Sequence, residues 1–243
     1  MASSRSAQSN SPAVLTVQDA LWPPYYFGDS ELHTGFAKEI LERCLPAGEL
    51  PFEFFSFPIV RMFNYLRSGE IDVHVVSKSA EREDFLWYGQ EPLFVSSYRP
   101  IVRTNYELEV HSLADLDGHR LGAIRGVDYV DWFQKYLGQR DRAGSLEWAP
   151  DNESILRMLL ADRIDVFVNT ASTSKWLAQE LGAADRIRVL DFDIKTSPYY
   201  VVVSRSSNAI ANPATFLAKV DSCIERLKTE PIYGQLEVQY HIN

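Results

Sequence analysis

Short apolar runs alternate with amphipathic segments along most of the chain, from Val14 onward. The run VLTVQDA (14–20) predicts a strand, and GFAKEILERCL (35–45) predicts a helix with its apolar residues on one face. The run FEFFSF (52–57) predicts the next strand. This alternation indicates an α/β fold in which each sheet is mixed but mainly parallel and is flanked by helices.

One helix, turn and strand unit occurs twice. The segments LRSGEIDVHVV (66–76) and MLLADRIDVFVNT (158–170) each end a helical pattern and then open a strand with Ile-Asp-Val. The shared register aligns Ser77 with Thr170, so each predicted strand ends in a hydroxyl residue. Two similar lobes would bring these strand ends together at a cleft, which is where α/β sheets bind ligands.

Two segments rich in β-branched and aromatic residues, 95–105 and 195–207, predict extended crossings between the lobes. The chain would then run from lobe 1 to lobe 2 and back. We expect lobe 1 to comprise residues 13–98 and 201–243, and lobe 2 to comprise residues 99–200. Residues 1–12 are rich in serine, contain no apolar segment and are expected to be disordered.

The charge and composition narrow the classes of partner. The 33 acidic residues outnumber the 24 basic ones, which gives a formal charge of −9 and disfavours nucleic acids and anionic membrane surfaces. No apolar run approaches the roughly 18 residues that span a bilayer, so membrane insertion is not expected. The two cysteines, Cys44 and Cys223, are too few for a disulfide scaffold and are expected to be buried free thiols.

The sequence contains no motif typical of a catalytic or cofactor site. Neither a nucleophile elbow, a zinc-protease helix, a dinucleotide-binding loop nor a phosphate-binding loop occurs. We therefore expect no catalytic residue, no metal site and no cofactor. His74, on a predicted strand that leads to the cleft, could act as a base; a histidine of the core or the surface is the alternative.

The predicted strand at 71–76 runs directly into Ser77, Lys78 and Ser79, and Arg82 follows. A planar guanidinium matches the two oxygens of a carboxylate, and small hydroxyl groups can complete such an anion site. The alternative is an arginine in the first turn of a surface helix.

Four stretches, in this order, resemble the type II periplasmic solute-binding proteins, in particular the extracellular solute-binding family 3 that serves amino-acid ABC transporters. They are WPPYYF with GFAKEIL behind it; LRSGEIDVHVVSKSAERE leading to FLWYGQEPLF; LADLDGHRLGAIRGVDYVDWF; and MLLADRIDVFVNTAS. The resemblance covers nearly everything from Val14 onward. It implies two lobes joined by two crossing strands, and a monomer that binds a small carboxylate-bearing solute for delivery to a membrane permease.

The resemblance also implies a set of ligand-binding residues. Arg82 would pair with the ligand carboxylate, and the aromatic segment with Tyr25 and Tyr26 would pack on the ligand, although ordinary core aromatics are the alternative. Arg61 resembles a second arginine found in some members, with a solvated helix residue as the alternative. The full predicted set is Tyr25, Tyr26, Arg61, Ser77, Ser79, Arg82, Gly126, Val127, Asp128, Tyr129, Asn169 and Thr170.

One departure from the family pattern concerns the ligand's amino group. Where the family usually has an aspartate for that group, this chain has Asn169 and Thr170, which cannot offer the same charge-assisted hydrogen bond. Asp128 could take over that contact, or it could cap the helix predicted to follow it. Simple α-amino acids are therefore expected to bind poorly unless Asp128 contributes.

The resemblance implies a periplasmic protein whose leader peptide has been removed. It leaves two alternatives to transport: a sensor module of the same fold, and a dehydratase-like enzyme on this fold. The ligand's identity is not determined by the sequence.

Overall fold

The computed structural model describes residues 14–28, 30–58, 61–127 and 129–242. The helices are α1 (Phe36–Cys44), α2 (Met62–Ser68), α3 (Ala80–Glu83), α4 (Asp131–Arg142), α5 (Asn152–Leu160), α6 (Ala171–Glu180), α7 (Pro213–Lys228) and α8 (Pro231–Gln239), with short 3₁₀ turns at Leu45–Gly48, Leu113–Leu116 and Ala184–Arg186. The strands are β1 (Leu15–Gln18), β2 (Leu21–Trp22), β3 (Tyr26–Phe27), β4 (Phe52–Phe55), β5 (Val73–Ser77), β6 (Leu86–Arg103), β7 (Leu121–Ile124), β8 (Leu146–Ala149), β9 (Val166–Thr170), β10 (Ile187–Val189) and β11 (Lys195–Ser204). The segment 1–12, predicted to be disordered, lies outside the described residues.

Nine of the described strands form one sheet that runs through both halves of the molecule, in the order β4-β1-β5-β11-β6-β9-β7-β8, with β10 beside β6. Each half has three parallel strands with the first strand of the half in the middle: β4-β1-β5 in one and β8-β7-β9 in the other. We call the half with β1, β4 and β5 lobe 1, and the half with β7, β8 and β9 lobe 2. The predicted α/β fold class is confirmed.

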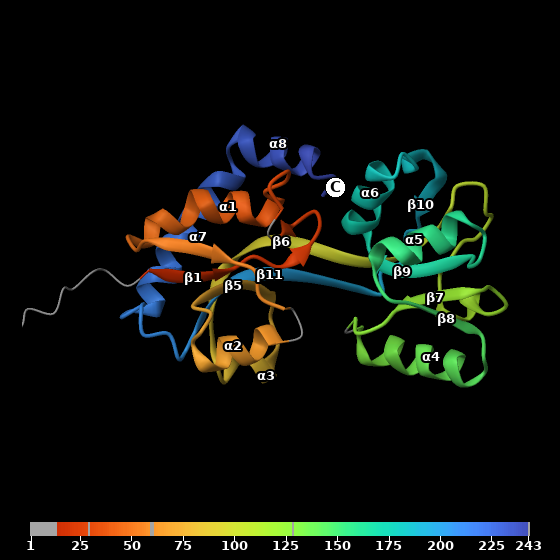
Figure 1. Ribbon diagram of the computed structural model, residues 1–243, viewed down its shortest axis with the longest axis horizontal. Coiled ribbons are helices and arrows are strands. Elements are labelled where there is room, and N and C mark those ends of the chain that lie inside the picture. Colours follow the sequence, from red (N-terminus) through yellow and green to blue (C-terminus); the bar gives the residue numbers. More distant parts are fainter. Residues whose placement is uncertain (1–13, 29, 59–60, 128, 243) are drawn as a thin grey trace, which may run out of the picture.

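The strands β6 and β11 connect the lobes. They pair with each other antiparallel from Lys195 opposite Tyr98 to Ser204 opposite Leu86. At one end β11 pairs with β5 of lobe 1, and at the other end β6 pairs with β9 of lobe 2. In Figure 1 they are the two long ribbons that run from the left half of the molecule to the right half.

The repeated Ile-Asp-Val tripeptide has the same structural role in both lobes. The Asp72 carboxylate, just before β5, accepts a hydrogen bond from the backbone N–H of Thr16 at 2.8 Å. The Asp165 carboxylate, just before β9, accepts one from the backbone N–H of Arg120 at 2.9 Å. Each aspartate thus ties the start of its strand to the neighbouring parallel strand, so the sequence repeat reflects a repeated structure.

Helices cover both faces of the sheet in each lobe (Figure 1). In lobe 1 the main core forms between the sheet and α1 and α7, and a smaller core forms under α2. In lobe 2 one core contains Phe133 and Leu137 of α4, and another contains Ile155 and Leu159 of α5. Each lobe has its own core, but Trp176 of α6 packs into the lobe 1 core, so the lobes are linked by the crossing strands and by a contact between α6 and lobe 1.

Cys44 and Cys223 form a disulfide, so the expectation of two free thiols was wrong. The two residues lie 179 positions apart in the sequence, but α1 and α7 pack against each other in lobe 1 and bring their Cα atoms to 5.4 Å. That separation is within the usual range for a disulfide. The pairing depends on helix packing, which the spacing of two cysteines could not reveal.

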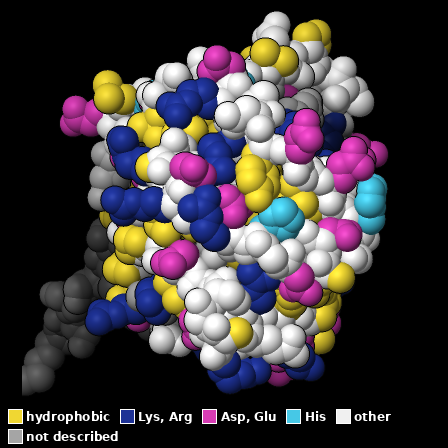
Figure 2. All heavy atoms as spheres, turned by 90° about the vertical axis from the view of Figure 1, so that its right-hand side faces the viewer, with side chains coloured by type: hydrophobic (Ala, Val, Ile, Leu, Met, Phe, Trp, Pro, Cys, Tyr) yellow, Lys and Arg dark blue, Asp and Glu magenta, His cyan; other side chains and the backbone are white. Residues whose placement is uncertain are grey.

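Among the described residues, no helix is long and apolar enough to cross a membrane. On the face formed by the lobe 2 end of the molecule, Lys and Arg side chains are interspersed with Asp and Glu (Figure 2). The ion pairs of Arg120 and Arg103 with Asp162 and Asp165 in lobe 2 are an example. Such mixed charge lacks the single-sign patch that nucleic-acid binding requires.

Candidate functional site

A cavity of about 420 Å³ lies between the two lobes. It is formed where β1, β5, β7 and β9 reach their carboxyl ends, which is where open α/β sheets bind ligands, and its volume suits a small molecule. We call it the interlobe cleft. It is lined by Ala20, Leu21, Trp22, Met62, Phe63, His74, Val75, Val76, Ser77, Arg82, Tyr98, Arg125, Gly126, Val127, Asn152, Asn169, Thr170, Lys195 and Tyr199.

On the lobe 1 side, the guanidinium of Arg82 is held at the end of β5. Its Nη1 donates to the carbonyl oxygen of Ser77 at 3.1 Å and lies 3.3 Å from the Ser77 hydroxyl, and its central carbon lies 4.4 Å from the centre of the Phe63 ring. No carboxylate in the described part of the chain pairs with it. Tyr199 of β11 lies opposite Ser77 in the strand pairing. The side chain is partly exposed, as an anion-binding group must be.

On the lobe 2 side, three cleft residues form one row across neighbouring strands. Tyr98 of β6 lies opposite Lys195 of β11 and, on its other edge, opposite Thr170 of β9. Opposed residues in antiparallel strands have their Cβ atoms about 5 Å apart, so the three side chains are neighbours. The Thr170 hydroxyl is buried and has no partner among the described residues. Next to it, the Asn169 amide donates to Asn152 at 2.9 Å.

The loop after β7 contributes Arg125, Gly126 and Val127. The backbone of Gly126 has a φ of +79°, a conformation that glycine adopts without strain. The Arg125 guanidinium is exposed and lies 5.3 Å from the Trp148 ring, and it too has no carboxylate partner in the part of the chain that the structure describes.

Six of the predicted binding residues therefore line the cleft, namely Ser77, Arg82, Gly126, Val127, Asn169 and Thr170. Neither Tyr25 nor Tyr26 does. Tyr26 is completely buried, and Tyr25 stacks on Phe94 with the ring centres 4.1 Å apart. The aromatic residue that this segment contributes is Trp22, at the end of the short strand β2, with its ring 5.1 Å from that of Tyr199.

Three further predicted residues, Arg61, Ser79 and Tyr129, do not line the cleft. Arg61 is exposed at the start of α2, which begins at Met62, and Ser79 precedes α3. Tyr129 is buried, and its hydroxyl donates to the Val168 carbonyl oxygen while accepting from the N–H of Ile124. Asp128 lies outside the described residues, and α4 begins later than predicted, at Asp131.

His74 reaches the cleft lining but is almost fully buried. Burial lowers the pKa of its imidazole to about 3, because the charged form would lose its hydration. The ring is therefore neutral at physiological pH. No group of His, Cys, Asp and Glu side chains in the described part of the chain is arranged to hold a metal ion.

The sequence reasoning missed several cleft residues, above all Trp22, Tyr98, Arg125, Asn152, Lys195 and Tyr199. One signal was available: Lys195 and Tyr199 lie at even spacing on a predicted strand, so they had to share a face. Arg125 lines the same cleft as Lys195 and Tyr199 because of the way the two lobes are arranged, and no local sequence pattern shows that arrangement.

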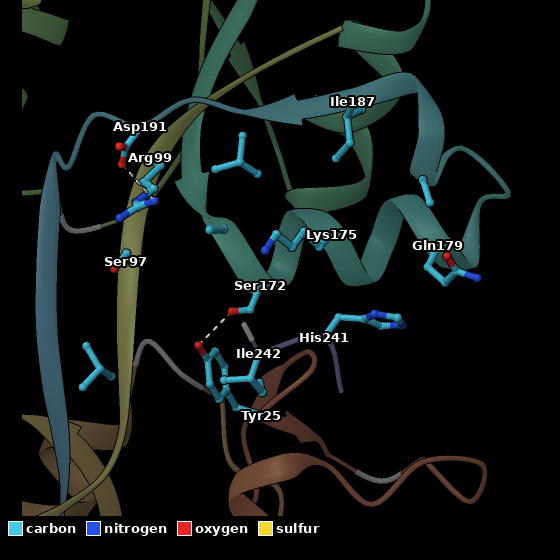
Figure 3. Close-up of a pocket in the computed structure, with 14 residues that line it drawn as sticks. Tyr25, Ser97, Arg99, Ser172, Lys175, Gln179, Ile187, Asp191, His241 and Ile242 are labelled. Atoms are coloured by element: carbon cyan, nitrogen blue, oxygen red, sulfur yellow. Dashed lines mark hydrogen bonds and ion pairs between the residues drawn. The ribbon is translucent and has the colours of Figure 1, made fainter. Parts of the chain in front are cut away.

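A second, larger cavity of about 800 Å³ lies between α6 and the C-terminal residues, and we call it the α6 cavity. Figure 3 shows Lys175 and Gln179 of α6 facing His241 and Ile242, and Tyr25 reaching Ser172 from lobe 1. The Tyr25 and Ser172 hydroxyl oxygens are 2.8 Å apart. Arg99, the one arginine that lines this cavity among the described residues, is already paired with Asp193 at 2.7 Å and with Asp191 at 3.4 Å. The α6 cavity is thus larger, but the interlobe cleft has the cations without carboxylate partners, and we take the cleft as the candidate site.

No family model matches this chain, and no curated protein matches it. Many solved structures do. A histidine kinase sensor domain with similarity to periplasmic binding proteins is 20% identical, with 96% of this chain and 97% of that one covered and a TM-score of 0.70. The ligand-binding core of GluR0 from Nostoc punctiforme, in complex with L-glutamate, is 17% identical, with 93% and 98% covered and a TM-score of 0.67. An ancestral arginine-binding protein bound to arginine is 19% identical, with 95% and 98% covered and a TM-score of 0.67. At these identities the comparison shows the fold, and it confirms the predicted resemblance at that level.

Proposed function

We propose that this chain, which has the two-lobed fold of the periplasmic binding proteins, binds a small carboxylate-bearing solute in the interlobe cleft and does not alter it chemically. The observation that carries the proposal is the position of Arg82. Its guanidinium lines the cleft between two lobes, is held in place by Ser77, and lacks a carboxylate partner in the described part of the chain. A guanidinium that is partly shielded from water and has no counter-ion is well suited to bind a ligand carboxylate.

Binding is proposed to close the cleft by a hinge motion. Lobe 1 would comprise residues 13–98 and 201–243, and lobe 2 would comprise residues 99–200. Support comes from the two crossing strands and from the cores that lie mainly within one lobe or the other, with Trp176 of α6 packing into the lobe 1 core. Two crossing strands can bend, so a ligand that contacts both lobes favours the closed arrangement.

A non-catalytic role is supported by the state of His74. With its pKa lowered to about 3, the buried imidazole holds no proton at neutral pH and is a very weak base. Two of the three structural neighbours described above, the GluR0 ligand-binding core and the arginine-binding protein, are ligand-binding proteins, which supports the same interpretation.

Delivery of the solute to the permease of an ABC transporter, in the periplasm, is the role we propose first. A sensor role is the second candidate, because one neighbour that covers nearly the whole chain is a histidine kinase sensor domain. The two differ in assembly. A delivery protein is expected to stay monomeric with and without ligand, whereas a dimer that appears only with ligand in sedimentation experiments would favour the sensor.

The binding proposal is tested by thermal shift against a panel of amino acids, monocarboxylates, dicarboxylates and amines, because a ligand that binds only the folded state raises its melting temperature. The best ligand is then titrated by calorimetry into the wild type, Arg82→Ala and Arg82→Lys. Losing a bidentate charged contact is expected to weaken binding by about 100- to 1000-fold in Arg82→Ala, and Arg82→Lys is expected to lose much of that.

Arg61→Ala is the matched control. Arg61 is an arginine of the same lobe as Arg82, but it is exposed and does not line the cleft. Its affinity should equal that of the wild type. If the Arg82 variants bind as tightly as Arg61→Ala does, the cleft arginine does not hold the ligand and the proposal fails.

A further inference from the structure

We infer that the interlobe cleft selects a dicarboxylate without an amino group, with one carboxylate on Arg82 and the other between Arg125 and Lys195. This rests on the proposed binding function and specifies its ligand. Arg125 and Lys195, which form the second cationic position, belong to no sequence motif typical of a binding site.

Among the residues that the structure describes, the charges of the cleft lining are all positive. Three cations line it, Arg82, Arg125 and Lys195, and no aspartate or glutamate occurs among the described residues that do. This is unexpected in a chain with 33 acidic and 24 basic residues. None of the three forms an ion pair within the described part of the chain, whereas Arg99, Arg103, Arg120 and Arg140 all do.

The three cations do not share one position. Arg82 belongs to lobe 1 and Arg125 to lobe 2, and Lys195 lies at the lobe 2 end of the crossing strand β11. Along β11, Lys195 is four residues from Tyr199, which lies opposite Ser77 beside Arg82. At the rise of an antiparallel strand this places their Cα atoms roughly 13 Å apart. A short chain with an anionic group at each end matches two separated cationic positions better than one compact anion does.

The second position has hydrogen-bonding groups as well as charge. Lys195, Tyr98 and Thr170 lie in one row across three strands. The Thr170 hydroxyl is buried at the cleft and has no partner in the part of the chain described here. An unpaired buried hydroxyl is costly, so a carboxylate that accepts its hydrogen bond would gain more than the contact alone.

The same charges disfavour an amino group on the ligand. Three cations around one small cavity repel each other and would repel an ammonium group. Asn169, whose amide nitrogen donates to Asn152, could offer an ammonium group only a neutral amide oxygen and not a carboxylate. A dicarboxylate leaves a smaller net charge in the closed cleft than a monocarboxylate or an amino acid does.

Calorimetry with matched probes tests this. Succinate and glutarate are compared with butyrate and valerate, which have the same chain lengths and one carboxylate, and with glutamate, which is glutarate with an amino group. We expect at least one dicarboxylate to bind 10-fold or more tightly than its monocarboxylate partner and than glutamate. Inorganic phosphate, a compact dianion, is expected to bind more weakly than that dicarboxylate.

The variants Arg125→Gln and Lys195→Gln assign the second position. Each should weaken the dicarboxylate by about 10-fold or more and leave the monocarboxylate nearly unchanged, whereas Arg82→Ala should weaken both. Arg163→Gln is the charge-matched control, because Arg163 is exposed in lobe 2 and does not line the cleft.

Several outcomes would overturn the inference and leave the proposed function standing. These are monocarboxylates that bind as tightly as dicarboxylates through Arg82, or tight glutamate binding that Asp128→Asn abolishes. Equal dicarboxylate affinity in Arg125→Gln, Lys195→Gln and Arg163→Gln would also overturn it. Preferred binding of phosphate would overturn the proposed carboxylate-binding function as well. If no probe binds in an Arg82-dependent way, both the inference and the proposed function fail.

Discussion

The Arg82 guanidinium is hydrogen-bonded to the residue that ends the strand before it: Nη1 lies 3.1 Å from the Ser77 carbonyl oxygen and 3.3 Å from the Ser77 hydroxyl. The backbone contact fixes the position of the guanidinium whatever the side chain at residue 77, and the Phe63 ring supports it from another side at 4.4 Å. An arginine held in this way loses less rotamer freedom when a ligand binds.

Ser77→Ala is therefore expected to weaken ligand binding only modestly, by about 3- to 10-fold, since one neutral hydrogen-bonding group is lost and the backbone contact stays. Calorimetry with the best ligand measures the change. Ser79→Ala is the control, because Ser79 belongs to the same short segment but does not line the cleft. An equal effect of the two substitutions would contradict the position assigned to Ser77.

The disulfide between Cys44 and Cys223 is expected to stabilise lobe 1. It closes a loop of 179 residues, and cross-links over long loops restrict the unfolded chain by about 2–5 kcal/mol. Reduction with a thiol should lower the urea midpoint of the wild type. A Cys44→Ala/Cys223→Ala double variant should unfold at that lower midpoint with or without reductant. A wild type insensitive to reductant, with its thiols shown to be free, would contradict the disulfide.

The buried His74 is expected to make stability depend on pH between about 3 and 6.5. Burial holds its folded-state pKa at about 3, so only the unfolded chain takes up a proton on this residue in that range. The stabilisation is full above the unfolded pKa and is lost as the pH falls, with a slope of up to about 1.4 kcal/mol per pH unit.

Urea unfolding of the wild type and of His74→Phe at several pH values measures this. The free energy of unfolding of the wild type should fall relative to that of the variant between pH 6.5 and pH 4, and the difference should be constant above pH 7.5. A difference that does not change with pH would mean that His74 takes up its proton in the folded state over the same pH range as in the unfolded chain.

Asp165 is also expected to make stability depend on pH, in a lower pH range than His74 does. Its hydrogen bonds with Arg120, followed by the contact with Arg103, lower the pKa of its carboxyl to about 2 although burial opposes this. The folded state thus favours the carboxylate, and this stabilisation is present above the unfolded pKa near 3.9 and is lost as the pH falls towards 2.

Asp165→Asn should reduce the free energy of unfolding at pH 7 by about 2 kcal/mol, the scale of hydrogen bonds to a charged group, and the loss should shrink between pH 4 and pH 2. Asp162→Asn is the control, because Asp162 contacts the same two arginines but its side chain is 69% exposed. Its effect should be smaller, as for most exposed ion pairs. Urea titrations at pH 7, 4 and 3 compare the two, and equal losses would contradict the role of burial.

The local structure and much of the architecture follow from the order of the residues along the chain. Helices such as α1 and strands such as β5 follow from apolar spacing, because a residue's neighbours at i+2, or at i+3 and i+4, decide which face it shares. The two Ile-Asp-Val units predicted a repeated lobe, and Asp72 and Asp165 indeed play the same part in each. Arg82 could be identified as an anion-binding candidate because it directly follows a strand end that carries Ser77.

Which distant residues meet depends on how the helices and strands pack together. Helix packing brought Cys44 to Cys223, and the sharp turn between β2 and β3 placed Trp22 in the cleft while Tyr25 and Tyr26 were buried. Sheet order and strand register placed Lys195 beside Tyr98 and Thr170. The charge of the cleft is a sum over side chains from α3, the loop after β7 and β11, which lie far apart in the chain. Periodicity reports only on neighbours within one turn or one strand, so it could identify Arg82 but not the two cations that share its cavity.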